Sequence, residues 1–178
     1  MIFKETKLKG AYLIDLGKNK DERGFFARFF CEKEFAAHKL KLSIKQSSIS
    51  YNKKKGILRG MHYQSAPHQE IKLVSCVRGA IYDVIIDLRK NSRTYLKWIA
   101  AELNSRNFTS LYIPKGFAHG FQALEDNSVV LYQMSEFYYP EYARGIRWDD
   151  VMFGIKWPLR EKILSEKDRS YPQYINRF

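Results

Sequence analysis

The sequence predicts an all-β protein, an antiparallel sandwich or barrel of short strands with few helices. About ten apolar or alternating runs follow one another at spacings of roughly 8–12 residues, and turn residues end each run. The connections are too short for the crossover helices that parallel strands need. The runs are rich in aromatic and β-branched side chains, which favour a half-buried pleated surface. The predicted strands are 11–16, 24–30, 44–51, 60–64, 71–77, 80–88, 97–103, 110–113, 117–124 and 129–137.

The elements between these strands follow from local composition. Residues 32–41 have helical character and are predicted as the one clear helix. Residues 53–56 and the Arg78–Gly79 pair are predicted turns. The chain beyond Trp157 is predicted to contain short helices and loops. The interior of the resulting barrel is the expected ligand pocket.

Length and composition limit the class of protein. The 178 residues, with 45% hydrophobic and 15% aromatic side chains, fit one globular domain over 1–178 and argue against disorder. Two cysteines, Cys31 and Cys76, exclude a disulfide-rich scaffold. Charge interrupts every apolar run, so we expect no membrane association. The first residues lack the apolar core of a secretory signal, and a cytoplasmic location is therefore expected.

The chain is strongly basic. It carries 31 basic and 19 acidic residues, a net charge of +12. Residues 1–60 hold 15 basic and 6 acidic side chains, so an excess of 15 − 6 = 9 charges lies there. This balance favours an anionic partner such as nucleic acid, anionic lipid or a phosphorylated small molecule. A lysine-rich solvated surface explains the same charge without a partner.

Four segments concentrate side chains that can do chemistry. They are 56–64 (GILRGMHYQ), 113–121 (IPKGFAHGF), 131–138 (LYQMSEFY) and 164–168 (LSEKD). On a regular strand Arg59 and His62 face opposite sides, so a twist or bulge at Gly60 is needed to bring both to one cavity. In the second segment, small residues flank His119 and allow close approach.

Two other kinds of site are weighed and disfavoured. The His-x-His that opens the usual cupin metal pattern is replaced here by His62-Tyr63-Gln64, so no bound metal is expected. Nucleic-acid binding calls for basic and aromatic side chains interleaved on one face, and Arg28, Phe30, Tyr51 and Lys53 offer only a weak version. Nucleic acid is therefore not expected as a partner.

Taken together, the segments resemble the dTDP-4-dehydrorhamnose 3,5-epimerase family. The resemblance runs nearly end to end and includes DERGFF at 21–26, KGILRGMHYQ at 55–64, PKGFAHGF at 114–121 and LSEKD at 164–168. It implies a homodimeric cupin-type jelly-roll barrel with a few short peripheral helices and no cofactor. It also implies a 4-keto-6-deoxy sugar nucleotide as substrate, used to supply deoxysugar for a surface polysaccharide or a glycosylated metabolite. The ketone at C4 acidifies the hydrogens on C3 and C5, and the enzyme inverts one or both carbons.

The resemblance assigns four catalytic residues. His62 resembles the base, Asp168 the carboxylate that orients it, Tyr132 the acid on the opposite face, and Lys72 the group that stabilises the enolate oxygen. A positioned acid or base of this kind contributes about 10²–10⁴ in rate. The residues that resemble substrate-binding groups are Arg23, Arg28, Gln46, Arg59, His119 and Tyr138.

One departure from the family pattern bears on the nucleotide. Family members commonly have Glu where this chain has Arg28, in a nucleotide-lining position. A carboxylate accepts the N3–H of thymine, whereas arginine suits the acceptors at N3 and O2 of cytosine. A CDP-linked sugar is therefore an alternative to the dTDP-linked one. Three further alternatives stay open: epimerisation at C3 or C5 alone, a 3,4-ketoisomerase on a related jelly roll, and a non-catalytic module that binds nucleotide sugars.

Overall fold

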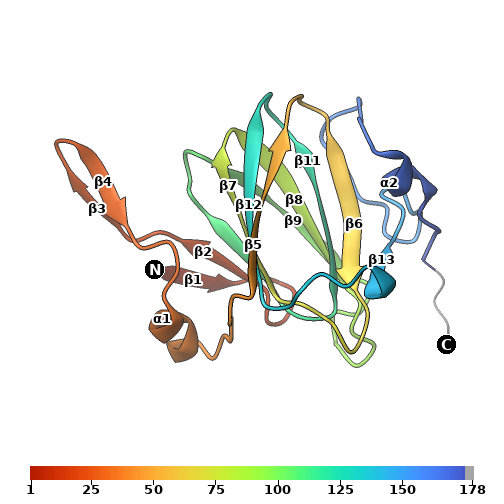
Figure 1. Cartoon of the computed structure of the whole chain (residues 1–178), viewed down its shortest axis with the longest axis horizontal. Coiled ribbons are helices and arrows are strands. Elements are labelled where there is room, and N and C mark those ends of the chain that lie inside the picture. The colour runs from red at the N-terminus through yellow and green to blue at the C-terminus, as the bar shows by residue number, and fades with distance from the viewer. Residues whose placement is uncertain (175–178) are drawn as a thin grey trace.

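Two antiparallel sheets face each other in the computed structural model, which describes residues 1–174 (Figure 1). The first sheet has the order β1 (Ile2–Glu5), β2 (Tyr12–Asp15), β10 (Ser110–Ile113), β7 (Lys72–Arg78), β12 (Ser128–Met134) and β5 (Gln46–Asn52). The second has the order β13 (Ala143–Gly145), β6 (Leu58–Gln64), β11 (Phe117–Ala123), β8 (Ala80–Asp87) and β9 (Trp98–Asn104). Every strand pairing within the two sheets is antiparallel, which confirms the predicted all-β class.

The main core lies between the two sheets. Val74 and Val130 of the six-stranded sheet and Ile81 and Phe121 of the five-stranded sheet belong to one cluster and are fully buried. Alternate residues of each strand point to this core, as the period of two requires. Removal of these apolar side chains from water drives the two sheets together.

The C-terminal segment covers the outer face of the five-stranded sheet. Val84 and Ile86 of β8 pack there against Ile146 and Phe153. Because β8 is covered on both faces, nearly all of its residues are buried. The segment also contains the 3-10 turn η1 (Pro140–Tyr142) and the short helix α2 (Glu166–Ser170), which lies beside β6 (Figure 1).

The helix α1 (Glu32–Ala37) packs on the six-stranded sheet through Phe35, which contacts Ile14 and Tyr112. The predicted helix over 32–41 begins where expected and ends four residues early. Lys39 has a φ of 60°, outside the right-handed helical region, and the N–H of Leu40 returns to the carbonyl of Phe35. The helix therefore stops within two turns.

A hairpin of β3 (Lys18–Asp21) and β4 (Gly24–Ala27) forms a separate sheet that stands away from the body of the molecule (Figure 1). The predicted strand over 24–30 ends at Ala27 because its partner β3 has only four residues. Phe30 packs against Phe35 instead, with the ring centroids 5.0 Å apart.

Each of the ten predicted strands corresponds to a strand in the structure. The strands missed from the sequence, β1, β3 and β13, have only three or four residues and lie at a sheet edge or in the separate hairpin. Residues 175–178 of the predicted 1–178 domain lie outside the described residues. In the described part of the chain, no helix has the length and apolar character that crossing a membrane requires.

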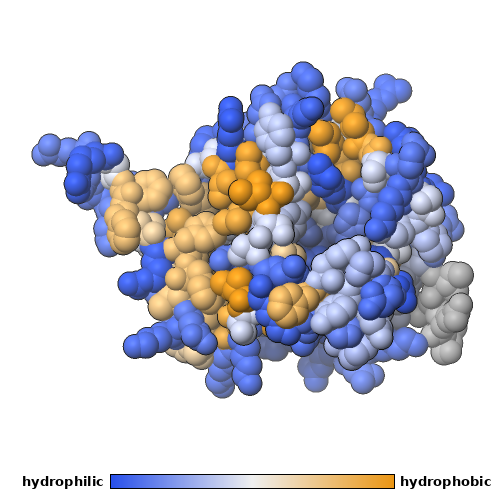
Figure 2. Space-filling model, viewed as in Figure 1, coloured by the Kyte–Doolittle hydropathy of each residue, from blue (hydrophilic) through white to orange (hydrophobic). Residues whose placement is uncertain are grey.

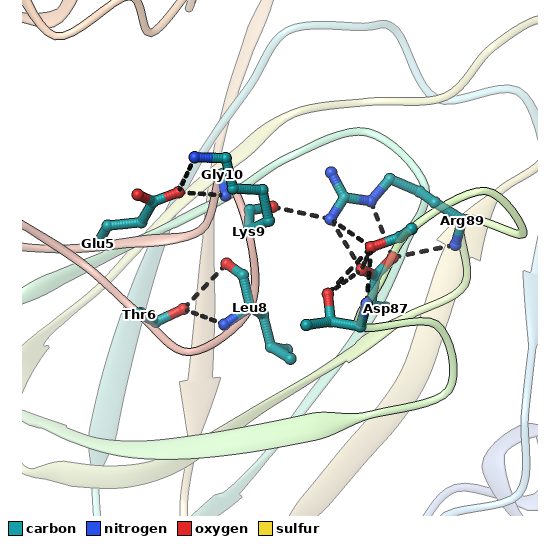
Figure 3. Close-up of polar contacts among 9 residues, drawn as sticks. Glu5, Thr6, Leu8, Lys9, Gly10, Asp87 and Arg89 are labelled. Carbon is teal, nitrogen blue, oxygen red and sulfur yellow. Dashed lines mark hydrogen bonds and ion pairs between the residues drawn. The ribbon is translucent and has the colours of Figure 1, made fainter.

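A buried carboxylate ties the turn between β1 and β2 to the end of β8 (Figure 3). The side chain of Asp87 is fully buried and accepts hydrogen bonds from Arg89 at 2.8 Å, Ser92 at 2.6 Å and Thr94 at 2.7 Å. Arg89 also donates to the carbonyl of Lys9 at 2.7 Å. Burial opposes ionisation of Asp87, but the hydrogen bonds outweigh it and lower its pKa to about 2.

Replacement of Asp87 by asparagine should destabilise the fold in a pH-dependent way. The folded-state pKa lies below the unfolded value of about 3.9, so the carboxylate contributes stability above pH ~4 that is lost as the pH falls toward 2. We expect Asp87→Asn to lower the free energy of unfolding at pH 7 by about 2 kcal/mol. Urea unfolding across this pH range measures the difference, which should shrink below pH ~4.

Asp149→Asn is the control, because Asp149 forms an exposed ion pair with Arg147 at 2.8 Å. Such pairs contribute about 0–1 kcal/mol. A difference between Asp87→Asn and wild type that stays constant down to pH 2.5 would contradict the prediction.

Candidate active site

A cavity of about 600 Å³ opens between the two sheets and the C-terminal segment. Strands β5, β7 and β12 line one side, β6 and β11 line the other, and α2 closes part of its rim. Eight of the residues predicted for the site line this cavity: Gln46, Arg59, His62, Lys72, His119, Tyr132, Tyr138 and Asp168.

A bulge in β6 brings Arg59 and His62 to the same cavity. Opposite β11, His62 pairs with His119 and Arg59 pairs with Phe121, so β6 has one residue more than its partner over this stretch. The strands approach closely at Gly60, where a Cβ atom would lie 2.5 Å from the Cα of Gly120. Gly60 also has a φ of 131°, which favours glycine. The bulge expected at Gly60 is confirmed.

His62 is hydrogen-bonded to Asp168 across the cavity rim. Nε2 of His62 lies 2.5 Å from Oδ1 of Asp168, whose side chain is only 7% exposed. Ser165 caps α2 by accepting a hydrogen bond from the backbone N–H of Asp168, which fixes the carboxylate at the start of the helix. Burial raises the pKa of Asp168, but the hydrogen bond and charge of His62 outweigh it, and the pKa lies below its ordinary value.

Tyr171 packs against the other side of His62. The two ring centroids are 5.6 Å apart in an edge-to-face arrangement. Gly145 of β13 leaves room for the tyrosine, because a Cβ atom there would lie 2.4 Å from its ring carbons. The C-terminal segment thus holds the imidazole through both a carboxylate and an aromatic ring.

Tyr132 approaches the cavity from the opposite sheet. It lies on β12 of the six-stranded sheet, whereas His62 lies on β6 of the five-stranded sheet. Burial and then the charge of Asp83 raise the pKa of Tyr132 well above its ordinary value, and Arg59 offsets this only in part. The phenol is therefore protonated at neutral pH and can donate a hydrogen bond.

His119 forms a second, deeper pair with Asp83. Its Nε2 lies 2.7 Å from Oδ1 of Asp83, and both side chains are buried. The His119 ring meets the Tyr132 ring edge to face, with the centroids 5.8 Å apart. His119 and Tyr132 both line the cavity, whereas Asp83 does not and supports His119 from within the protein.

Arg59 and Gln46 are held in the cavity by hydrogen bonds, and one of their partners, Asn52, was not identified by the sequence analysis. Arg59 donates from Nε to the side-chain oxygen of the buried Asn52 at 2.9 Å. Gln46 accepts from the backbone N–H of Tyr138 at 2.8 Å. Spacing alone offers one usable signal for such neighbours, since residues two apart on a strand share a face.

Arg23 and Arg28 do not reach the cavity of their own chain. Both belong to the projecting hairpin or its exit, where Arg23 pairs with Asp21 at 2.6 Å and Arg28 with Glu34 at 3.0 Å. The side chain of Arg23 is 89% exposed. The structure therefore brings eight of the ten predicted residues together and leaves these two on a separate surface.

Comparisons with known proteins identify the family of the chain. A family model described as dTDP-4-dehydrorhamnose 3,5-epimerase matches residues 5–176. The dTDP-4-dehydrorhamnose 3,5-epimerase of Methanothermobacter thermautotrophicus is 45% identical over 172 residues, which cover 95% of this chain and 92% of that protein.

Solved structures give the same result. The dTDP-4-dehydrorhamnose 3,5-epimerase of Bacillus anthracis, with TDP and PPi bound, superposes with a TM-score of 0.95 at 38% identity, covering 97% of this chain and 99% of that chain. A 3'-monoepimerase of Streptomyces bikiniensis in complex with dTDP-quinovose has a TM-score of 0.87 at 29% identity, covering 94% and 85%. The predicted cupin-type jelly roll is confirmed. The chain belongs to the dTDP-4-dehydrorhamnose 3,5-epimerase family and is an isomerase of the epimerase class.

Proposed function

We propose that this enzyme epimerises a dTDP-linked 4-keto-6-deoxyhexose, dTDP-4-dehydro-6-deoxyglucose, at C3 and C5. The observation that carries the proposal is the placement of a carboxylate-bound histidine and a protonated tyrosine on opposite sheets of one cavity. Inversion at carbon needs a base on one face of the sugar and an acid on the other. The bound TDP of the Bacillus anthracis relative supports the thymidine nucleotide.

In the proposed reaction, His62 removes the proton from C3 or C5, and the electron pair of that bond moves to the C4 oxygen. Asp168 orients the imidazole and stabilises its positive charge. Lys72 stabilises the enolate oxygen, and Tyr132 returns a proton to the carbon from the opposite face. Solvent then reprotonates Tyr132 and takes the proton from His62. Only protons are transferred, so the scheme uses no cofactor.

Substitution of the acid and the base should separate deprotonation from inversion. We expect His62→Asn to lower the exchange of the C3 and C5 hydrogens with D₂O by about 10²–10⁴. Tyr132→Phe should keep exchange at a carbon that His62 can deprotonate but lose inversion, because deuterium then returns only from the histidine side. Proton NMR of the sugar nucleotide in D₂O measures both, and the sugar configuration is read from ring coupling constants.

The same experiment tests the substrate. Wild-type enzyme with the dTDP sugar should lose the signals of both H3 and H5, whereas loss of one signal would identify a mono-epimerase. Exchange with the CDP-linked sugar alone would overturn the choice of nucleotide and point to Arg28 as a base selector. Exchange with neither sugar would contradict the proposed reaction and favour a binding module.

We also propose that a second copy of the chain completes the site. Ser48 and Ser50 of β5 line the cavity, so the alternate residues Ile49 and Tyr51 point outward, where they are 70% and 48% exposed. On the hairpin, Phe26 is 76% exposed. Figure 2 shows apolar atoms gathered between the hairpin and β5. A two-fold dimer that buries this surface would carry the hairpin's Arg23 toward the partner's cavity.

Mixing of two inactive variants tests this assembly. His62→Asn removes the base from its own cavity but keeps the hairpin, whereas Arg23→Ala keeps the base and removes the arginine. If Arg23 acts across the interface, a refolded 1:1 mixture should recover about a quarter of wild-type activity, because half of the dimers have one intact site. Activity no higher than that of the separate variants, or a monomer by sedimentation, would refute the arrangement.

A further inference from the structure

We propose that Glu70 is a positioning residue that holds the ammonium group of Lys72 in place for the developing enolate. This inference rests on the proposed function, in which Lys72 stabilises the C4 oxygen. Oε1 of Glu70 lies 3.0 Å from Nζ of Lys72, and both side chains line the cavity. No residue of the predicted catalytic set holds Lys72.

The ion pair lies within the protein rather than on its surface. The side chains of Lys72 and Glu70 are 12% and 11% exposed. Two charges with so little contact with water lose much of their hydration. Because that loss opposes the attraction between them, a buried ion pair need not stabilise the fold. Charged groups kept in a cleft beside catalytic side chains are instead typical of functional sites.

Ile71, the residue between Glu70 and Lys72, is fixed by two hydrogen bonds to Ser135. The N–H of Ile71 donates to Oγ of Ser135 at 2.8 Å, and the N–H of Ser135 donates to the carbonyl of Ile71 at 3.0 Å. Lys72 is the first residue of β7, Glu70 lies two residues before the strand begins, and the side chains of both line the cavity. The carboxylate therefore restrains the ammonium on a rigid part of the wall.

We expect Glu70 to affect the formation of the enolate more than the binding of the substrate. An ammonium group has three N–H donors, so Lys72 can donate one to Glu70 and still present others to the substrate oxygen. The cavity also contains the cationic Arg59 and Lys167, and a carboxylate beside Lys72 keeps its positive charge from being repelled toward solvent. Loss of the carboxylate leaves the lysine stem free to change rotamer, so the ammonium meets the enolate less often.

The test is the kinetics of Glu70→Gln, an isosteric change that removes the charge. We expect kcat and the rate of C–H exchange in D₂O to fall together by about ten- to a hundredfold. KM and the affinity for dTDP should change less than about threefold, since the lost interaction acts in the transition state. Glu70→Asp, which retains the charge, should recover part of kcat.

Glu136→Gln is the matched control. Glu136 also pairs with a lysine, Lys45, at 2.6 Å, and its side chain is 16% exposed, but neither residue lines the cavity. This variant should keep wild-type kcat and KM. Melting temperatures of the two glutamine variants identify any general loss of stability.

A double variant isolates the path through Lys72. If Glu70 acts by positioning that lysine, Glu70→Gln should slow exchange no further in a Lys72→Gln background. Unchanged kcat in Glu70→Gln, or additive losses in the double variant, would overturn the role of Glu70 and leave the proposed epimerase intact. Absence of exchange by the wild-type enzyme with both sugar nucleotides would overturn the two proposals together.

Discussion

The hydrogen bond between His62 and Asp168 depends on how the C-terminal segment packs. The two residues are 106 positions apart, and they meet only because the segment after β13 covers the outer face of the five-stranded sheet. That packing buries Ile146 and Phe153 against β8 and places α2 beside β6. Burial of apolar surface on the outside of the barrel thus places a carboxylate beside His62 at the cavity.

The two facing sheets place different polar groups on opposite sides of one cavity. Strands of opposite sheets contribute His62 and Tyr132, which are the base and the acid of the proposed reaction. The electrostatic environments of the two sides differ. The carboxylate that supports His62 has a lowered pKa, and the pKa of Tyr132 is raised by burial. A jelly roll is therefore well suited to proton transfer through opposite faces of a bound ring.

Charge is distributed in two layers around this cavity. Inside the cavity, two of the cations are held by polar neighbours: Asn52 holds Arg59 and Glu70 holds Lys72. Outside, the hairpin carries Arg23 on an exposed apolar support. In the proposed reaction the inner layer acts on the chemical step, and in the proposed dimer the outer layer reaches the cavity of the second copy. The excess of basic residues in the first third of the sequence belongs partly to each layer.

Residue patterns were sufficient to predict the all-β class and ten of the strands, and the family resemblance assigned the eight predicted residues that line the cavity. Strand alternation and turn residues are local signals, and the resemblance carried the site because its motifs keep their order along the chain. The early end of the helix at Lys39, the separate hairpin and the pairing of Glu70 with Lys72 required the tertiary structure. The hairpin depends on which segments meet in the fold. The end of the helix and the Glu70–Lys72 pair are local in the sequence, but the backbone angle at Lys39 and the burial of the pair depend on the surrounding structure.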